Sequence, residues 1–151
     1  MPEAPFHYGL ILEGVFLAFI LLGLLSTDSP ELSNELLAEK LNEYFSSQKD
    51  FSLEFEEVPL TGDIVLNLRF GEWHVTVSYE DDEVVKEDSL EIQNRTANFK
   101  VHDVSNIDRR VRVIFGNDDK REYTNETVYL MDFLCNIHGI IVYDPQQNNF
   151  M

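Results

Sequence analysis

The chain has 151 residues, of which 28 are acidic and 11 are basic, so its formal net charge at pH 7 is −17. This length suits one domain, residues 1–151, and the apolar content of 44% allows a proper core, which argues against disorder throughout. The negative charge repels phosphate, so it argues against binding to nucleic acids or anionic membranes. It favours a basic protein partner, unless it serves only solubility.

The sequence carries no recognisable motif for chemistry. Its single cysteine, Cys135, cannot form an internal disulfide, and no group of Cys and His has zinc spacing. P-loop, dinucleotide, nucleophile-elbow and metalloprotease motifs are absent too. We therefore expect no catalytic residues, no cofactor and no metal site, and a reducing compartment.

The most apolar run is "GVFLAFILLGLL", from Gly14 to Leu25. A membrane-spanning helix needs about 20 such residues, and extending this run upstream meets Glu13. The leader "MPEAPFHY" contains Glu3 and no Lys or Arg, unlike a secretory signal. We therefore predict a central strand buried on both faces, or alternatively a buried helix, in a cytoplasmic protein without a membrane segment.

A helix is predicted next, over roughly residues 30–46. Ser29 is the expected N-cap and Pro30 the expected first helical residue. Apolar residues recur at helical spacing on one face, and acidic residues dominate the other. The apolar face consists of Leu32, Leu36, Leu37, Leu41, Tyr44 and Phe45.

Three strands are then predicted as an antiparallel meander, because apolar and polar residues alternate in each. Their sequences are "FSLEFEEV", "DIVLNLRF" and "WHVTVSY", beginning at residues 51, 63 and 73. Gly62 indicates the first turn. Gly71 and Glu72 form the second, although Phe70 to Glu72 could instead be a bulge in one long bent strand.

Residues 84–96 allow two interpretations. Val85, Ser89 and Ile92 are helically spaced, whereas a strand through Leu90 and Ile92 fits nearly as well. We favour a short helix, preceded by an acidic turn at Glu80 to Glu83.

The pattern of the last third of the sequence predicts a strand, then a helix and then another strand. "RRVRVIF" alternates as a strand, and Thr124 or Asn125 is expected to cap the helix. We expect Cys135 to be buried and inert in this helix, and Gly139 to adopt the left-handed backbone of a helix end. Residues 140–143 are all apolar, as in an interior strand. The helix's apolar face is expected to be Val128, Met131, Leu134 and Ile137.

These elements together predict an α+β domain. Its expected form has two layers, a mainly antiparallel sheet with helices on one face, and is loosely ferredoxin-like.

Two groups of polar residues are candidate catalytic or metal sites. Glu72 and His74 flank Trp73 and could form an acid–base pair, but exposed polar residues on a strand are commonplace. The segment "NDDKRE" offers carboxylates without the glycine and spacing of a calcium loop, so a solvated turn is preferred.

Acidity is concentrated in one part of the sequence. Asp28 to Glu91 holds 18 acidic and 4 basic residues, a net charge of −14, whereas Arg95 to Glu122 is slightly basic. Complementary charge speeds association with a cationic partner, and aromatic residues near it commonly anchor the contact. The residues expected to bind that partner are Glu72, Trp73, Tyr79, Glu80, Asp81, Asp82, Glu83, Glu87 and Asp88.

With its acidic stretch "SYEDDEVVKEDSLE" and its ending "FLCNIHGIIVYDPQ", the chain resembles the immunity proteins that bacteria make against toxins. The resemblance is one of general character over the whole chain. It implies stoichiometric binding to a toxin that acts in the cytoplasm, for which a cationic nuclease would suit best.

Two other functions remain open from the sequence. One is a phage-type inhibitor or DNA mimic, although mimics usually spread acidic residues over nearly the whole surface. The other is a small enzyme or ligand-binding module that uses the sheet face near Glu72 and His74.

Overall fold

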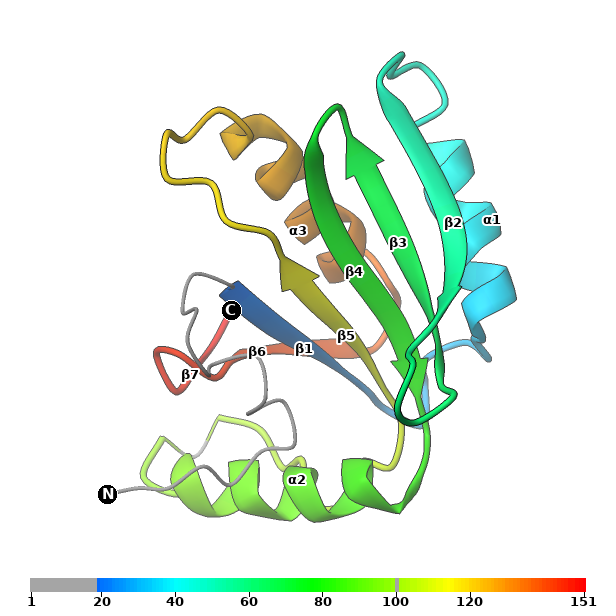
Figure 1. The fold of residues 1–151 in the computed structure, drawn as a ribbon. Helices are drawn as coiled ribbons and strands as arrows, with labels where there is room; N and C mark the ends of the chain where they lie inside the picture. The colour runs from blue at the N-terminus through cyan, green and yellow to red at the C-terminus, as the bar shows by residue number, and fades with distance from the viewer. Residues whose placement is uncertain (1–18, 100) are drawn as a thin grey trace.

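The structure is a computed structural model that describes residues 19–99 and 101–151. Seven strands form one sheet in the order β2-β3-β4-β5-β1-β6-β7, and all neighbouring strands are antiparallel (Figure 1). The α+β class and the antiparallel sheet are therefore confirmed. The elements are β1 (Phe19–Leu25), α1 (Asn34–Tyr44), β2 (Phe51–Glu57), β3 (Ile64–Phe70), β4 (Trp73–Glu80), α2 (Glu83–Arg95), β5 (Arg110–Phe115), α3 (Thr124–Cys135), β6 (Ile140–Asp144) and β7 (Asn149–Phe150).

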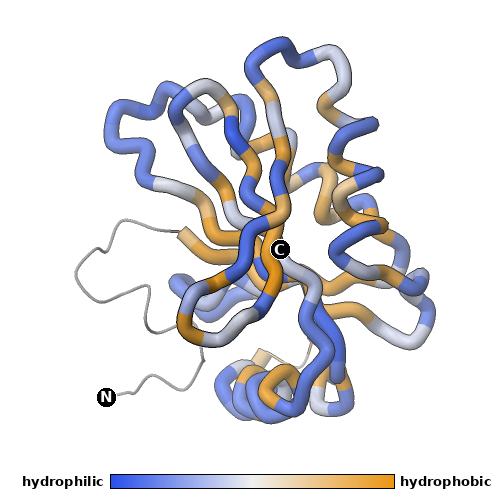
Figure 2. Tube along the Cα trace, turned by 45° about the vertical axis from the view of Figure 1, so that its right-hand side comes forward, coloured by the Kyte–Doolittle hydropathy of each residue, from blue (hydrophilic) through white to orange (hydrophobic). Residues whose placement is uncertain are grey.

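Strand β1 is the central strand that its apolar sequence predicts. It pairs with β5 on one side and β6 on the other, and apolar side chains from both of its faces are buried. Hydrophobic residues gather toward the middle of the molecule, where the strands lie (Figure 2). Leu21 and Leu25 join one core cluster, whereas Ile20, Leu22 and Leu24 join another. Alternation along a strand places these two sets on opposite faces of the sheet. Residues 14–18 of the apolar run lie outside the described residues.

Helices cover both faces of the sheet rather than one. Helices α1 and α3 share the first core cluster, which includes Leu37 and Leu134. Helix α2 packs through Ile92 against the second cluster, on the other face of β1. Because β1 is apolar on both faces, its second face also needs a cover, which α2 and the loop residues Val104 and Ile107 provide. The two-layer, ferredoxin-like description is therefore not confirmed.

The meander and the helical interpretation of residues 84–96 are confirmed. Phe70 pairs with Trp73, so β3 and β4 are joined by a two-residue turn rather than a bulge. Gly71 has φ +65°, a left-handed conformation that favours glycine. Helix α2 buries Val85, Ser89 and Ile92, as its spacing predicts.

Helix α1 begins four residues later than the predicted start at Pro30. Its N-cap is Ser33, whose Oγ accepts a hydrogen bond from the N–H of Leu36 at 3.1 Å. The predicted cap, Ser29, lies in a turn in which its Oγ accepts from the N–H of Ser26. Arg109 holds this turn outside the helix by donating hydrogen bonds to the carbonyls of Ser26, Ser29 and Pro30.

The region around α3 departs from the prediction in three details. Val128, expected on the apolar face, is 48% exposed, whereas Leu130 is buried. Neither Thr124 nor Asn125 caps the helix; instead, Asp118 accepts hydrogen bonds from the N–H groups of Glu122 and Tyr123 just before it. Cys135 is exposed, not buried, because it lies about 100° around the helix from the buried Leu134.

After α3, the chain returns to the sheet through a left-handed glycine. Gly139 has φ +76°, as expected, although it lies beyond the helix C-cap at Asn136. Strand β6 then pairs with β1 along one edge and, at Tyr143 and Asp144, with the short β7 on the other. The sequence did not predict β7.

Candidate functional site

The strongest candidate site is a groove of about 590 Å³ beside the β2–β3 hairpin. The hairpin loop forms one wall, and the end of β4 with the residues just after it forms another. Part of β5 also lines the groove. Its charged lining consists of Glu56, Asp63, Glu80, Asp81, Asp82 and Arg112. We call this feature the acidic groove.

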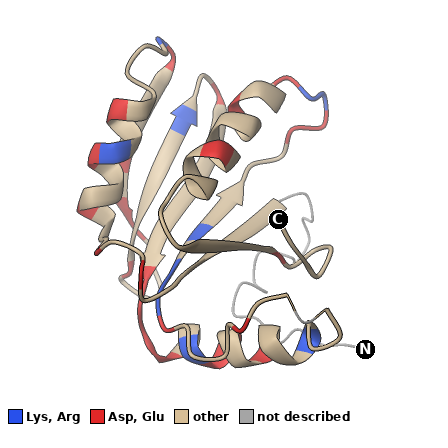
Figure 3. Cartoon of the chain, turned by 180° about the vertical axis from the view of Figure 1, so that it is seen from behind, with Lys and Arg blue, Asp and Glu red and all other residues tan. Residues whose placement is uncertain are grey.

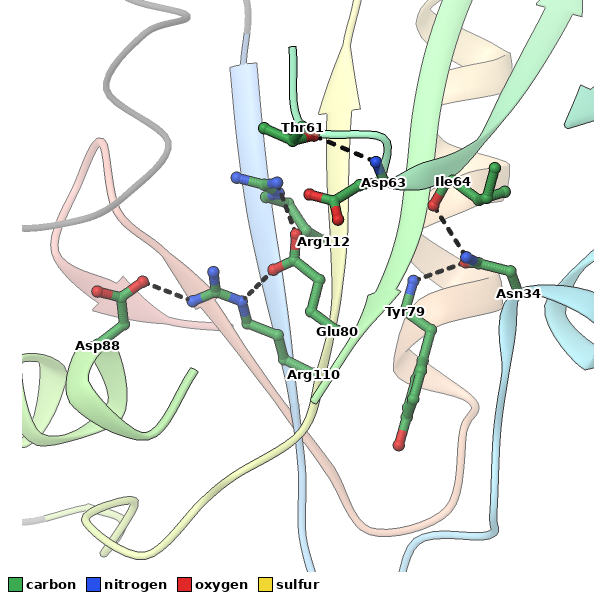
Figure 4. Close-up of polar contacts among 9 residues, drawn as sticks. All are labelled: Asn34, Thr61, Asp63, Ile64, Tyr79, Glu80, Asp88, Arg110 and Arg112. Carbon is green, nitrogen blue, oxygen red and sulfur yellow. Dashed lines mark hydrogen bonds and ion pairs between the residues drawn. The ribbon is translucent and has the colours of Figure 1, made fainter. Parts of the chain in front are cut away.

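Asn34, the first residue of α1, fixes two walls of the acidic groove relative to each other. Its side-chain amide donates to the carbonyl of Ile64 at 3.0 Å and accepts from the N–H of Tyr79 at 2.9 Å (Figure 4). One side chain therefore ties the start of β3 to the end of β4. A site held by secondary structure in this way is more rigid than one built only from loops.

The hairpin loop itself is closed by local hydrogen bonds. The N–H of Val58 donates to the carbonyl of Asp63 at 2.8 Å, and the N–H of Asp63 donates to Oγ1 of Thr61 at 3.2 Å. Gly62 supplies the left-handed backbone of the turn, with φ +75°. These contacts hold the loop in a defined shape and leave Asp63 exposed.

A network of two carboxylates and two arginines borders the groove, and two of its members, Glu80 and Arg112, line it (Figure 4). Glu80 accepts from Nε of Arg110 at 2.7 Å and from Nη2 of Arg112 at 2.6 Å. Arg110 also donates to Asp88 at 2.9 Å. The side chains of Arg110 and Asp88 are only 3% and 1% exposed, so this ion pair is shielded from water.

The arrangement of these charges leaves the acidic groove negative. Arg112 is its one basic lining residue in the described part of the chain, and Glu80 engages it. The carboxylates of Glu56, Asp63, Asp81 and Asp82 remain exposed around it. Such a concave set of like charges attracts cations.

Tyr79 lies beside these acids at the end of β4. Burial and, next in size, the negative charge of Asp81 raise the pKa of its phenol above the ordinary value of 10.0. The phenol therefore stays neutral at physiological pH and can donate a hydrogen bond.

The structure brings together four of the residues expected to bind a partner, namely Tyr79, Glu80, Asp81 and Asp82. Glu83 and Glu87 are exposed on the neighbouring helix α2. Two of the residues expected to bind a partner are not at the surface. Trp73 is 4% exposed and stacks on Tyr123, and Asp88 is buried against Arg110.

Glu72 does not belong to the same surface. It is exposed in the turn before β4, whereas Glu80 lies at the far end of that strand. A strand rises about 3.4 Å per residue, so the ends of the eight-residue β4 lie roughly 24 Å apart. The residues expected to bind a partner therefore do not form one continuous patch.

Three contributors to the acidic groove were missed from the sequence: Asn34, Glu56 and Asp63. They come from three separate segments that only the fold brings together. The alternation in β2 did place Glu56 on its polar face. The pairing register of the hairpin, had it been known, would have placed that residue beside Val65, at the start of β3.

Carboxylates also lie outside the acidic groove. Figure 3 shows acidic residues on α1, on α3 and in the loop between β5 and α3, with basic residues interspersed. Total charge therefore does not single out one face. What distinguishes the acidic groove is its concave shape together with its excess of carboxylates.

The other candidate groups show ordinary polar contacts. His74 is exposed, and its Nδ1 lies 3.2 Å from Oδ1 of Asn67. Among residues 19–99 and 101–151, no three His, Cys, Asp or Glu side chains are placed to hold a metal ion. Within the same residues, no helix has the length and apolar character to cross a membrane.

Comparison with protein-family models, with curated proteins and with solved structures gave no match.

Proposed function

We propose that the acidic groove binds a cationic segment of a protein partner and that the chain inhibits this partner, as immunity proteins inhibit toxins. One observation carries the proposal: exposed carboxylates from β2, the hairpin loop and the segment just after β4 converge on one concave surface. A cytoplasmic toxin with a basic active-site surface would be a suitable partner.

The charge chemistry supports a protein rather than a nucleic acid as the partner. A phosphate backbone entering the acidic groove would meet four exposed carboxylates and no unengaged basic lining residue among those described. A lysine or arginine side chain would instead gain charge-assisted hydrogen bonds there.

A DNA mimic is the second candidate, and helix α1 provides the observation that favours it. Glu35, Glu39 and Glu43 are exposed and succeed one another at four-residue intervals. This spacing forms a row of carboxylates rising about 6 Å per step along one helix face. A DNA-binding partner of a mimic would contact this row, whereas the first proposal places the contact in the acidic groove.

The test begins with capture of the partner, using the wild-type chain as bait with a native-host extract and with the product of the adjacent gene. A captured protein is then identified and its own activity is measured during titration with the wild-type chain. The proposal predicts a basic partner whose activity is lost at one equivalent. A partner that binds without being inhibited contradicts an inhibitory role.

Two charge-reversal variants then locate the contact. Asp63→Lys/Asp81→Lys reverses two acids of the groove, and Glu39→Lys/Glu43→Lys makes the same change in net charge on α1. The proposal predicts a loss of affinity of about tenfold or more for the groove variant only. A loss confined to the α1 variant would favour the DNA mimic.

A further inference from the structure

Strand β2 ends the sheet, and in the described part of the chain no strand pairs with its outer edge. Five of its seven residues are exposed, namely Ser52, Glu54, Phe55, Glu56 and Glu57. An open edge carries backbone N–H and C=O groups that are ready to pair with another strand. The edge is therefore a potential site for strand addition.

The hydrogen-bond register identifies which backbone groups point outward. Val58 donates to Asp63, and Gly71 donates to Asp50, so even-numbered residues of β2 form the hydrogen-bonded pairs with β3. In an antiparallel pair these alternate with pairs that make no hydrogen bonds to each other. The N–H and C=O groups of Leu53, Phe55 and Glu57 therefore face the open edge.

The side chains of β2 restrict which strand can pair there. Glu54, Glu56 and Glu57 are acidic, and the strand contains no basic residue. A second copy of β2 would place carboxylates beside carboxylates, which disfavours self-pairing. A strand with Lys or Arg on one face would instead be attracted. Phe55, which is 50% exposed, would contact an apolar residue on its other face.

The open edge is continuous with the acidic groove, because Glu56 belongs to both. We infer that β2 accepts an extended, basic segment of the partner as an added strand. Backbone hydrogen bonds to Leu53, Phe55 and Glu57 would hold this segment, and its cationic side chains would face Glu54 and Glu56. This inference rests on the proposed function and specifies how the partner docks.

The probe is a capped peptide as long as β2 that alternates Lys and Val, with a control peptide N-methylated at alternate amides. Phe55→Pro removes an outward N–H without removing a hydrogen bond to β3. Phe55→Ala removes the same side chain and keeps the N–H. The inference predicts that Phe55→Pro binds the peptide about tenfold more weakly than Phe55→Ala.

Hydrogen exchange of the wild-type chain gives a second readout that does not depend on a variant folding. The peptide should slow exchange at the amides of Leu53, Phe55 and Glu57, whereas the N-methylated peptide should not. Equal binding of both peptides, equal affinity of the two Phe55 variants, or unchanged exchange at these amides would overturn the inference.

The captured partner separates this inference from the proposed function. Weaker binding to Phe55→Pro than to Phe55→Ala, with no effect of Asp63→Lys/Asp81→Lys, would support strand addition and contradict the acidic groove. Weaker binding to Asp63→Lys/Asp81→Lys, with equal binding to the two Phe55 variants, would support the acidic groove and overturn strand addition.

Discussion

The carboxylate of Glu80 lies 2.7 Å from Nε of Arg110, and these two residues are also directly paired between β4 and β5. The ion pair therefore links β4 and β5 at the end of their pairing. Because Glu80 also engages Arg112, it is occupied within the molecule. The charge offered to a partner comes instead from the exposed carboxylates of Glu56, Asp63, Asp81 and Asp82.

The first prediction concerns the buried side of this network. Asp88→Leu should lower the free energy of unfolding by about 3 kcal/mol, because it leaves Arg110 buried with one carboxylate fewer. Adding Arg110→Met should restore much of the loss, since no uncompensated charge remains there. Denaturant unfolding measures both variants.

Glu87→Leu provides the matched control for Asp88→Leu, because it removes the adjacent, exposed carboxylate of the same helix. It should change stability by less than about 0.5 kcal/mol. Equal effects of the two single variants would show that the pair of Asp88 and Arg110 does not stabilise the fold.

The second prediction concerns Gly139, where the chain leaves α3. A Cβ there would lie 2.6 Å from Oγ of Ser26 and 3.1 Å from the backbone nitrogen of Ser29, at φ +76°. Gly139→Ala should therefore cost about 2 to 4 kcal/mol, from both the backbone conformation and the close contacts.

Gly62→Ala separates these two causes. Gly62 has nearly the same φ, +75°, but the nearest atom to its added Cβ is 3.6 Å away, on Glu57. It should cost only about 1 kcal/mol. Urea unfolding of both variants checks the difference, and equal costs would refute the packing role given to Gly139.

The third prediction concerns the thiol of Cys135. Although the residue is exposed, partial desolvation and, next, the carboxylate of Asp132 raise the pKa of this thiol above the ordinary 9.0. Its thiolate fraction at neutral pH, and hence its alkylation rate by iodoacetamide, should be lower than in the unfolded chain. Because the folded pKa is raised, any related stability is present at low pH and is lost as pH rises through that pKa.

Asp132→Asn removes the charge and should shift the pH profile of alkylation toward lower pH. Rates measured across the alkaline range give the thiol pKa directly. A pKa at or below the ordinary value in the wild-type chain would contradict the environment described for Cys135.

The sequence predicted elements whose patterns are decided locally. The apolar run to Leu25 indicated a strand buried on both faces, and the alternation of β2, β3 and β4 indicated the meander. The predicted start of α1 was wrong because Ser29 and Ser33 are both suitable N-caps by residue type. Arg109, far along the chain, binds the carbonyls near Ser29, and this serine lies in a turn before the helix.

The candidate site was predicted less well, because it depends on contacts between distant segments. By residue type, an aspartate such as Asp88 is expected at the surface, yet it is buried in an ion pair with Arg110. Glu56 and Asp63 reach the acidic groove through the hairpin, whose register a single sequence does not specify. Counting charge along the chain located the acidic region but not its concave part.

The most direct test of the acidic groove is the association rate constant of the captured partner, measured by stopped flow at low and high salt. The wild-type chain, Asp63→Lys/Asp81→Lys and Glu39→Lys/Glu43→Lys are compared. At low salt we expect the groove variant to associate at least about tenfold more slowly than the wild-type chain, and the α1 variant to stay near the wild-type rate. High salt should narrow this difference in rate. Equal rates for the two variants at low salt would contradict the proposed contact in the acidic groove.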